Sequence, residues 1–258
     1  MKLSTETDGT GPDLVFLHGW GMNGAVWSSL ITPLAKRFRI TVIELPGHGA
    51  SEYDEYLPHF DDWVKACLEV APDNATWVGW SLGGQLAQRA AMKAPDRVER
   101  LILFTSSPRF VQGEAWDHAM ERAVLKLFAK ALVKDHAQTL GRFLSLQVQG
   151  DDGARETLRA LRSDIAARPE PNPQALEHGL DMLLTVDLRD QLPSITCQVL
   201  WLLSERDTLV PAAVAGDIRS LMPGAEIEVI PGAAHAPFLS HPEACLKAFD
   251  HFLGTSDD

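Results

Sequence analysis

The chain is poor in cysteine and has no long apolar run, and each shortage excludes a class of protein. Its 258 residues include three cysteines, Cys67, Cys197 and Cys245. They are odd in number and lack paired or metal-type spacing, so we expect buried free thiols rather than disulfides. The first residues, MKLSTETDGTGPDL, lack a signal-peptide apolar core, and no stretch approaches the roughly 20 apolar residues that span a bilayer. We therefore expect a cytoplasmic protein without membrane segments.

Positive charge is also scarce. Lysine and arginine number 23 against 35 aspartates and glutamates, a formal net charge of −12. Nucleic acids and anionic membranes require a basic surface, so neither is a predicted partner. The nine histidines show no H-E-x-x-H or similar spacing, so no metal site is predicted. No repeat or heptad pattern occurs, and we expect a monomer.

What the chain does contain is an alternation of strand-like and helix-like segments. Six apolar runs rich in β-branched residues predict buried strands at Asp13–His18, Arg39–Glu44, Ala75–Trp80, Val98–Thr105, Cys197–Ser204 and Ala225–Ile230. Amphipathic stretches predict helices at Trp27–Arg37, Phe60–Val70, Leu82–Ala94, Ala212–Leu221 and Ala244–Leu253. This order is typical of an α/β fold with a mostly parallel central sheet flanked by helices.

The alternation is interrupted once. From about Phe110 to Thr185 only helical periodicity appears, as in Leu125, Phe128 and Leu132, and the segment RPEPNP at 168–173 predicts a kink between helices. We interpret this region as a helical cap inserted into an α/β core. The predicted division is core at 1–109, cap at 110–185 and core again at 186–258.

One turn joins the third predicted strand to the helix that follows it. There Gly79-Trp80-Ser81-Leu82-Gly83 forms a G-x-S-x-G sequence, with Gly84 next. In a nucleophile elbow the serine adopts a strained backbone conformation, and glycines two residues away avoid collision between strand and helix. The pattern predicts Ser81 as a nucleophile, with the helix N-terminus aimed at developing negative charge.

An acid and a histidine follow in the order that such a triad requires. Asp207 comes just after the strand ending at Ser204, and His235 just after the strand ending at Ile230. Both therefore lie at the sheet edge where Ser81 is exposed. We predict that His235 accepts the proton of Ser81 and that Asp207 holds the imidazole tautomer.

Other polar residues near the predicted triad have structural interpretations. Glu205, two residues before Asp207, is the less favoured alternative acid. Asp187 and Asp190 precede the strand and are interpreted as anchors of the return from the insertion. His241 is interpreted as a structural residue at the start of the last helix, and His18 as a residue that holds a loop in shape.

The segment FLHGWGMN at 16–23 supplies the other half of the predicted site. The loop after the first strand of such folds provides one oxyanion donor. We assign it to the backbone N–H of Trp20, with the N–H of Leu82 as its partner. The Trp20 side chain would form a wall of the pocket.

The chain resembles the α/β-hydrolase superfamily over nearly its whole length. The segments HGWG, ELPGHGAS, GWSLGG, SERDTLVP and GAAHAPFLSHP occur in the expected order. Within the superfamily it resembles the biotin-pathway carboxylesterases that hydrolyse pimeloyl-[acyl-carrier protein] methyl ester, through Trp20 after His-Gly, GWSLGG, RFLSLQ at 142–147 and AAHAPF around His235. The resemblance implies an acyl-enzyme mechanism without a cofactor. It implies substrate contacts from Trp20, Ser81, Leu82, Phe143, Leu144, Ser145, Leu146, Gln147 and His235.

The same resemblance implies docking of an acidic acyl-carrier protein by Arg142, Arg155 and Arg159. Gln138 stands where the family has a further arginine, so the docking surface is expected to be weaker or rearranged. Basic residues also repeat along two predicted helices, at Lys126, Lys130, Lys134 and at Arg155, Arg159, Arg162. Without the resemblance, these rows would be interpreted as solvated helix faces.

Alternative functions share the same framework. Short-chain esterases, lactonases, haloperoxidase-like esterases and C–C bond hydrolases have this fold and triad, so these features do not separate them. Dehalogenases and epoxide hydrolases are disfavoured because their nucleophile is an aspartate, whereas this chain has Ser81. A ligand-binding receptor without turnover is a further alternative, disfavoured by the complete triad.

Overall fold

The computed structural model describes residues 1–254, and a seven-stranded sheet lies at the centre of this part of the chain. The strand order is β1-β3-β2-β4-β5-β6-β7. All neighbours run parallel except β1, which pairs antiparallel with β3. The strands are β1 (Thr5–Asp8), β2 (Asp13–Leu17), β3 (Arg39–Ile43), β4 (Ala75–Trp80), β5 (Val98–Phe104), β6 (Gln198–Ser204) and β7 (Glu226–Ile230).

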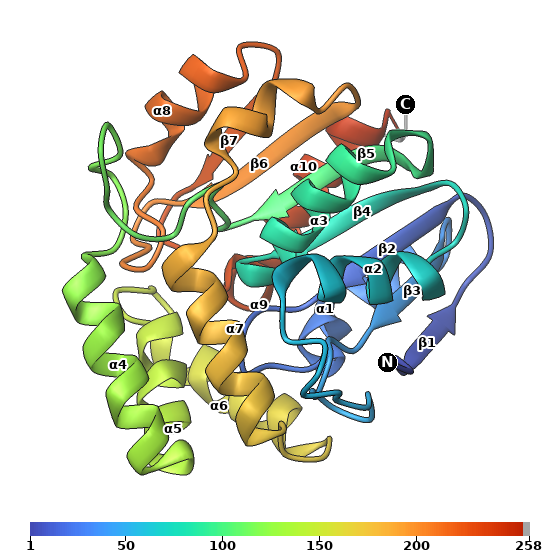
Figure 1. Cartoon of the computed structure of the whole chain (residues 1–258). Helices are drawn as coiled ribbons and strands as arrows, with labels where there is room; N and C mark the ends of the chain where they lie inside the picture. Colours follow the sequence, from blue (N-terminus) through green and yellow to red (C-terminus); the bar gives the residue numbers. More distant parts are fainter. Residues whose placement is uncertain (255–258) are drawn as a thin grey trace.

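Helices cover both faces of this sheet (Figure 1). Helices α2 and α3 lie on one face and α10 on the other, so the central strands are buried on both sides and are apolar throughout. These core helices are α1 (Ser28–Leu34), α2 (Phe60–Val70), α3 (Leu82–Lys93), α8 (Val214–Leu221), α9 (Pro237–Ser240) and α10 (Pro242–Leu253). Short 3-10 helices occupy η1 (Gly24–Trp27), η2 (Pro95–Arg97) and η3 (Arg189–Ser194). None of the helices within residues 1–254 is both long and apolar enough to cross a membrane.

Four consecutive helices interrupt the α/β order and lie together at the carboxyl ends of the parallel strands (Figure 1). They are α4 (Arg122–Lys134), α5 (His136–Gln147), α6 (Ala154–Ala166) and α7 (Pro173–Thr185). The predicted kink at 168–173 falls in the connection between α6 and α7. The two ends of the insertion meet in an antiparallel bridge between Arg109 and Asp187, whose side chains also form an ion pair. The division at residues 110 and 185 remains our interpretation.

The predicted strands correspond to β2 through β7, each with ends within one residue of the prediction. Two of the differences from the prediction have a local cause. Strand β1 was not predicted because all four of its side chains are exposed, which removes the apolar pattern. The predicted helix Trp27–Arg37 is split, since the Asn23 side chain caps a 3-10 turn before α1, and α1 ends at Leu34 just after Pro33.

Candidate active site

Ser81 lies on the sharp turn between β4 and α3. Its backbone angles are φ 54° and ψ −117°, a region that costs a non-glycine residue energy and persists only when the surroundings impose it. The N–H of Ser81 donates to the carbonyl of Phe104 at 3.0 Å, and the Ser106 hydroxyl donates to the Ser81 carbonyl at 2.8 Å. The neighbouring strand β5 and the loop after it therefore hold the strained turn.

The glycines around Ser81 provide the clearance that the sequence predicts. A Cβ atom on Gly79 would lie 2.5 Å from the carbonyl oxygen of Gly83, and one on Gly83 would lie 2.4 Å from that of His18. A Cβ on Gly84 would lie 2.5 Å from the Cβ and Oγ of Ser106. Any side chain at these positions would push the strand, helix and neighbouring loop apart.

The predicted acid and histidine are in contact. Oδ2 of Asp207 lies 2.7 Å from Nδ1 of His235, and both side chains are buried. Oδ1 of Asp207 accepts the backbone N–H groups of Leu209 at 2.8 Å and Val210 at 3.0 Å. The carboxylate is therefore fixed by its own turn. It orients the imidazole so that Nε2 is left to act as the base.

Three residues hold the backbone of His235. Its carbonyl accepts the indole N–H of Trp80 at 2.8 Å and the hydroxyl of Thr105 at 2.7 Å. Its N–H donates to the carbonyl of Gln147, at the end of α5, at 2.9 Å. Trp80 directly precedes Ser81, so its indole links the histidine loop to the elbow. Sequence reasoning missed these roles, because each depends on a contact between distant segments.

The hydroxyl of Ser81 and Nε2 of His235 are both buried, and neither has a hydrogen-bond partner within residues 1–254. No hydrogen bond joins them in this structure. Such bonds are often long in ligand-free enzymes and tighten when substrate binds. The structure therefore pairs Asp207 with His235. It leaves Oγ of Ser81 and Nε2 of His235, the atoms of the proposed proton transfer, without a hydrogen bond.

The loop at residues 18–23, called here the oxyanion loop, packs against the elbow. A Cβ on Gly19 would lie 3.4 Å from the Cβ of Ser81. Within the described chain, the N–H groups of Trp20 and Leu82 have no hydrogen-bond partner. They are therefore free to bind an oxyanion, and their assignment as donors remains a proposal.

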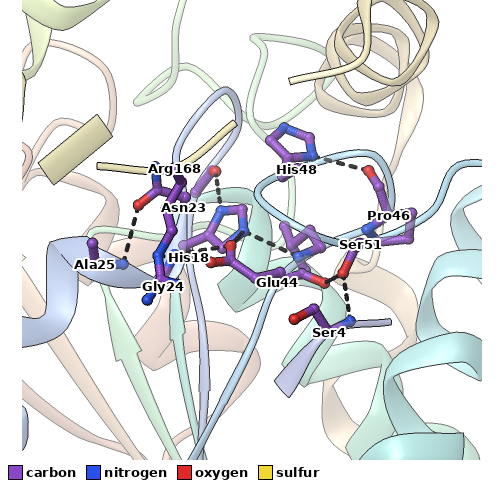
Figure 2. A network of polar contacts seen from close by, with 12 residues as sticks. Ser4, His18, Asn23, Gly24, Ala25, Glu44, Pro46, His48, Ser51 and Arg168 are labelled. Carbon is purple, nitrogen blue, oxygen red and sulfur yellow. Dashed lines mark hydrogen bonds and ion pairs between the residues drawn. The ribbon is translucent and has the colours of Figure 1, made fainter. Parts of the chain in front are cut away.

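His18 holds this loop, in agreement with its predicted role. Its Nδ1 donates to the carbonyl of Gly19 at 2.8 Å, and its Nε2 accepts the N–H of Leu45 at 3.0 Å. Figure 2 shows the ring beside the buried carboxylate of Glu44, which also accepts the N–H of Gly24 at 3.0 Å. Arg168, from the connection between α6 and α7, reaches the other oxygen of Glu44 at 3.8 Å. The insertion is thus tied to the base of the oxyanion loop.

The Trp20 side chain lies between the core and the insertion. Its indole N–H donates to the carbonyl of Leu176 in α7 at 2.8 Å. Its ring meets the ring of Phe143 in α5 edge-on, with centroids 4.8 Å apart, and that of Phe128 in α4 at 6.1 Å. The indole is only 1% exposed. It is therefore packed between the core and three insertion helices, and its role as a wall of the substrate pocket remains a prediction.

The predicted substrate stretch at the end of α5 faces two directions. Phe143, Leu144 and Gln147 are buried, and Oε1 of Gln147 has no hydrogen-bond partner among the described residues. Ser145 is exposed and, with the half-buried Leu146, lines an outer groove of about 490 Å³ between α5 and α6. The carbonyl of Gln147 accepts the N–H of His235, and the ring of Phe143 contacts that of Trp20. Substrate contact by any of them remains a prediction.

The alternative residues have other partners. Glu205 accepts the N–H of Gly232 at 2.8 Å and, within the described part of the chain, has no hydrogen bond or ion pair with His235. Asp187 binds Arg109 and Arg189 at the base of the insertion, and Asp190 lies in the first turn of η3. His241 is the residue before α10. These positions agree with the structural roles that the sequence predicts.

Comparison with known proteins places this geometry in a family. A model of the alpha/beta hydrolase fold matches residues 12–242. The chain belongs to the α/β-hydrolase family. Within this family, it is 42% identical over 251 residues to the pimeloyl-[acyl-carrier protein] methyl ester esterase of Photobacterium profundum, covering 97% of this chain and 98% of that protein. The esterase of the same name from Nitrosomonas europaea is 42% identical over 249 residues, with 96% and 98% covered.

A solved α/β-hydrolase structure agrees in fold. The esterase from Exiguobacterium antarcticum superposes with a TM-score of 0.89, covering 98% of this chain and 95% of that chain. Sequence identity is 20%, so this likeness concerns the fold alone.

Proposed function

We propose that this α/β hydrolase is a carboxylesterase of biotin synthesis that hydrolyses pimeloyl-[acyl-carrier protein] methyl ester to methanol and pimeloyl-[acyl-carrier protein]. The observation that carries the proposal is the full-length similarity, at about 40% identity, to esterases of that name. The buried Asp207–His235 pair and the strained Ser81 provide the matching chemistry.

In the acylation half-reaction, the Ser81 Oγ attacks the methyl ester carbonyl and His235 Nε2 takes the hydroxyl proton. The negative charge on the former carbonyl oxygen is bound by the N–H groups of Trp20 and Leu82. The C–O bond to the methoxy group then breaks, and His235 returns the proton to give methanol. Asp207 stabilises the imidazolium that forms between these two transfers.

In the deacylation half-reaction, water attacks the acyl-enzyme. His235 Nε2 removes a proton from the water while the same two N–H groups bind the new oxyanion. Collapse of this intermediate breaks the bond to Ser81, whose oxygen regains a proton from His235. The product carries a free carboxyl group at the end that had been esterified, and it stays attached to the carrier at the other end.

The carrier protein is proposed to dock on α5 and α6. Arg142, Arg155, Arg159 and Arg162 are all exposed on these helices, and none of them makes a hydrogen bond or ion pair within residues 1–254. Most other arginines of the chain have partners, such as Arg109 with Asp187 and Arg206 with Asp152. In a chain of net charge −12, a cluster of unpaired guanidinium groups favours an acidic partner.

The direct test is methanol release from pimeloyl-[acyl-carrier protein] methyl ester by the purified protein and by the Ser81→Ala variant. Loss of the nucleophile should lower turnover by about 10⁴-fold or more, as in other triads. If the wild type cleaves p-nitrophenyl butyrate but not the carrier-bound ester, the esterase mechanism holds and the proposed substrate is wrong.

A further inference from the structure

A second buried histidine contacts the oxyanion loop from a different part of the chain. His48 lies in the loop after β3 and is fully buried. Its Nδ1 lies 2.9 Å from the carbonyl oxygen of Pro46, and its Nε2 accepts the N–H of Gly21 at 3.2 Å. Figure 2 draws the contact between His48 and Pro46. The His18 and His48 rings are neighbours, with centroids 5.3 Å apart. None of the steps proposed above assigns His48 a role.

These contacts determine where the His48 ring carries its proton. A carbonyl oxygen only accepts, so Nδ1 must donate to Pro46, whereas a backbone N–H only donates, so Nε2 must be unprotonated. Burial, together with the neighbouring His18 ring, lowers the pKa of His48 to about 3. The ring therefore stays neutral at physiological pH and its Nε2 remains an acceptor.

The two histidines hold the two peptide groups on either side of the Trp20 Cα atom. The Gly19 carbonyl and the Trp20 N–H belong to one planar peptide group, and the Trp20 carbonyl and the Gly21 N–H belong to the next. His18 binds the first group through the Gly19 carbonyl, and His48 binds the second through the Gly21 N–H. With both planes held, the direction of the Trp20 N–H is fixed. A hydrogen bond to the Gly19 carbonyl also polarises that peptide group and strengthens its N–H as a donor.

We propose that His48 is a positioning residue for the reaction: its Nε2, by accepting the Gly21 N–H, keeps the Trp20 N–H aimed at the oxyanion. The inference rests on the proposed esterase mechanism, in which Trp20 is an oxyanion donor. His48 does not touch substrate. Its loss should therefore lower kcat, where the oxyanion forms, and change KM little.

Three substitutions separate the acceptor from the rest of the ring. His48→Gln keeps an acceptor near the position of Nε2, His48→Asn keeps a donor for Pro46 but lacks that acceptor, and His48→Leu removes both. Complete loss of an oxyanion donor costs about 10²–10³ in kcat, so misaiming one should cost roughly 10- to 100-fold. With p-nitrophenyl butyrate, we expect that loss for the Asn and Leu variants, with KM within about threefold of wild type and the Gln variant largely restored.

The rate at which a fluorophosphonate probe modifies Ser81 provides a second readout, because that reaction also forms an oxyanion. It should fall in parallel with kcat, and its end point counts the folded active sites. Wild-type kcat in folded Asn and Leu variants, or a Gln variant as slow as the Leu variant, would overturn the proposal.

If the variants do not fold, ¹⁵N NMR of the imidazole in the wild type still decides the matter. The proposal requires the proton of His48 on Nδ1, and a proton on Nε2 would refute it. Because p-nitrophenyl butyrate needs no carrier protein, its hydrolysis tests the role of His48 separately from the proposed substrate. Inactivity toward the carrier-bound ester alone contradicts the proposed substrate, whereas an unaffected His48→Leu variant contradicts the positioning role.

Discussion

The strained backbone of Ser81 depends on hydrogen bonds with its neighbours and on glycines that allow close backbone approach. A non-glycine residue in a sparsely populated region costs on the order of 1–3 kcal/mol, so the surroundings must impose the conformation. Here the imposing groups are the carbonyl of Phe104 and the hydroxyl of Ser106. The close approach of Gly83 to the carbonyls of Leu17 and His18 adds a backbone constraint. The elbow and the oxyanion loop are therefore in direct backbone contact at Gly83.

This contact predicts that Gly83→Ala damages activity and stability together. The new Cβ would lie 2.4 Å from the His18 carbonyl and 2.5 Å from that of Leu17, and neither backbone group can move without shifting the oxyanion loop. We expect the free energy of unfolding to fall by about 1–3 kcal/mol, the usual cost of overpacking. Hydrolysis of p-nitrophenyl butyrate should fall by about 100-fold or more, since oxyanion donors are displaced. Urea unfolding and initial rates measure the two effects.

The matched control is Gly216→Ala in α8, where a Cβ atom would meet no heavy atom within 4 Å. Alanine is a better helix former than glycine, so this variant should gain up to about 1 kcal/mol of stability and keep full activity. Equal behaviour of the two alanine variants would contradict the role assigned to Gly83.

At the scale of elements, the insertion contributes directly to the position of His235, the proposed base. Besides the bond from His235 to Gln147, the connection between α5 and α6 binds the loop after β7. Asp151 accepts the N–H of Ala234 at 3.2 Å, and the N–H of Asp152 donates to the carbonyl of Gly232 at 3.2 Å. The helices over the sheet therefore serve as more than a cover for the site.

Asp187 forms ion pairs with Arg109 and Arg189 where the insertion joins the core. Burial alone would raise the pKa of this carboxyl group, but hydrogen bonds from Arg189 and Arg109 outweigh burial and lower the pKa to about 2. The native state therefore binds a proton less readily than the unfolded chain, whose ordinary aspartate pKa is 3.8. The resulting stabilisation is complete above about pH 4 and disappears as the pH falls toward 2.

We accordingly predict that Asp187→Asn destabilises the protein at pH 7 by about 1 kcal/mol or less, because the group is about one-third exposed and screened by solvent. The difference from wild type should close as the pH falls from about 4 to about 2. Thermal melts across this range measure it. A difference that stays constant with pH would show that the carboxylate charge is not what fastens the insertion. Asp73→Asn, at a fully exposed carboxylate, serves as the control and should change little.

The elements that sequence could predict are those whose own residues carry the pattern. Strand β4 and helix α2 have their predicted limits because the pattern of apolar residues that defines each one lies within its own segment. Strand β1 has four exposed side chains, and only its pairing with β3 makes it a strand. The same distinction applies to the site. The G-x-S-x-G turn and the order of the predicted triad residues are visible in sequence. The hydrogen bond from the Gly21 N–H to His48 is not, because it depends on how distant loops pack.

At the scale of the whole molecule, charge is unevenly distributed. The chain carries a net charge of −12, which would repel an acidic partner at long range. Helix α4 presents Lys126, Lys130 and Lys134, all exposed and without ion pairs within residues 1–254. Together with the unpaired arginines of α5 and α6, they form rows of basic residues on an insertion that is not basic as a whole. On the proposed function, an acidic carrier would be attracted to these rows rather than to the insertion as a whole.

The last prediction concerns this steering. Reversing Arg142, Arg155 and Arg159 to glutamate should raise KM for the carrier-bound ester by about tenfold or more while leaving kcat within about threefold, because in the proposed docking these arginines contact the carrier and not the reacting carbonyl. Reversal of Lys2, Lys36 and Arg219, exposed basic residues outside the insertion, is the matched control and should change KM little.

Higher ionic strength should raise the wild-type KM and reduce the difference in KM between wild type and the arginine triple variant, since exposed charges are screened beyond about 8–10 Å at physiological salt. Hydrolysis of p-nitrophenyl butyrate should be unchanged in both triple variants. Equal KM values for the two triple variants on the carrier-bound ester would contradict docking on α5 and α6, whatever their activity on p-nitrophenyl butyrate.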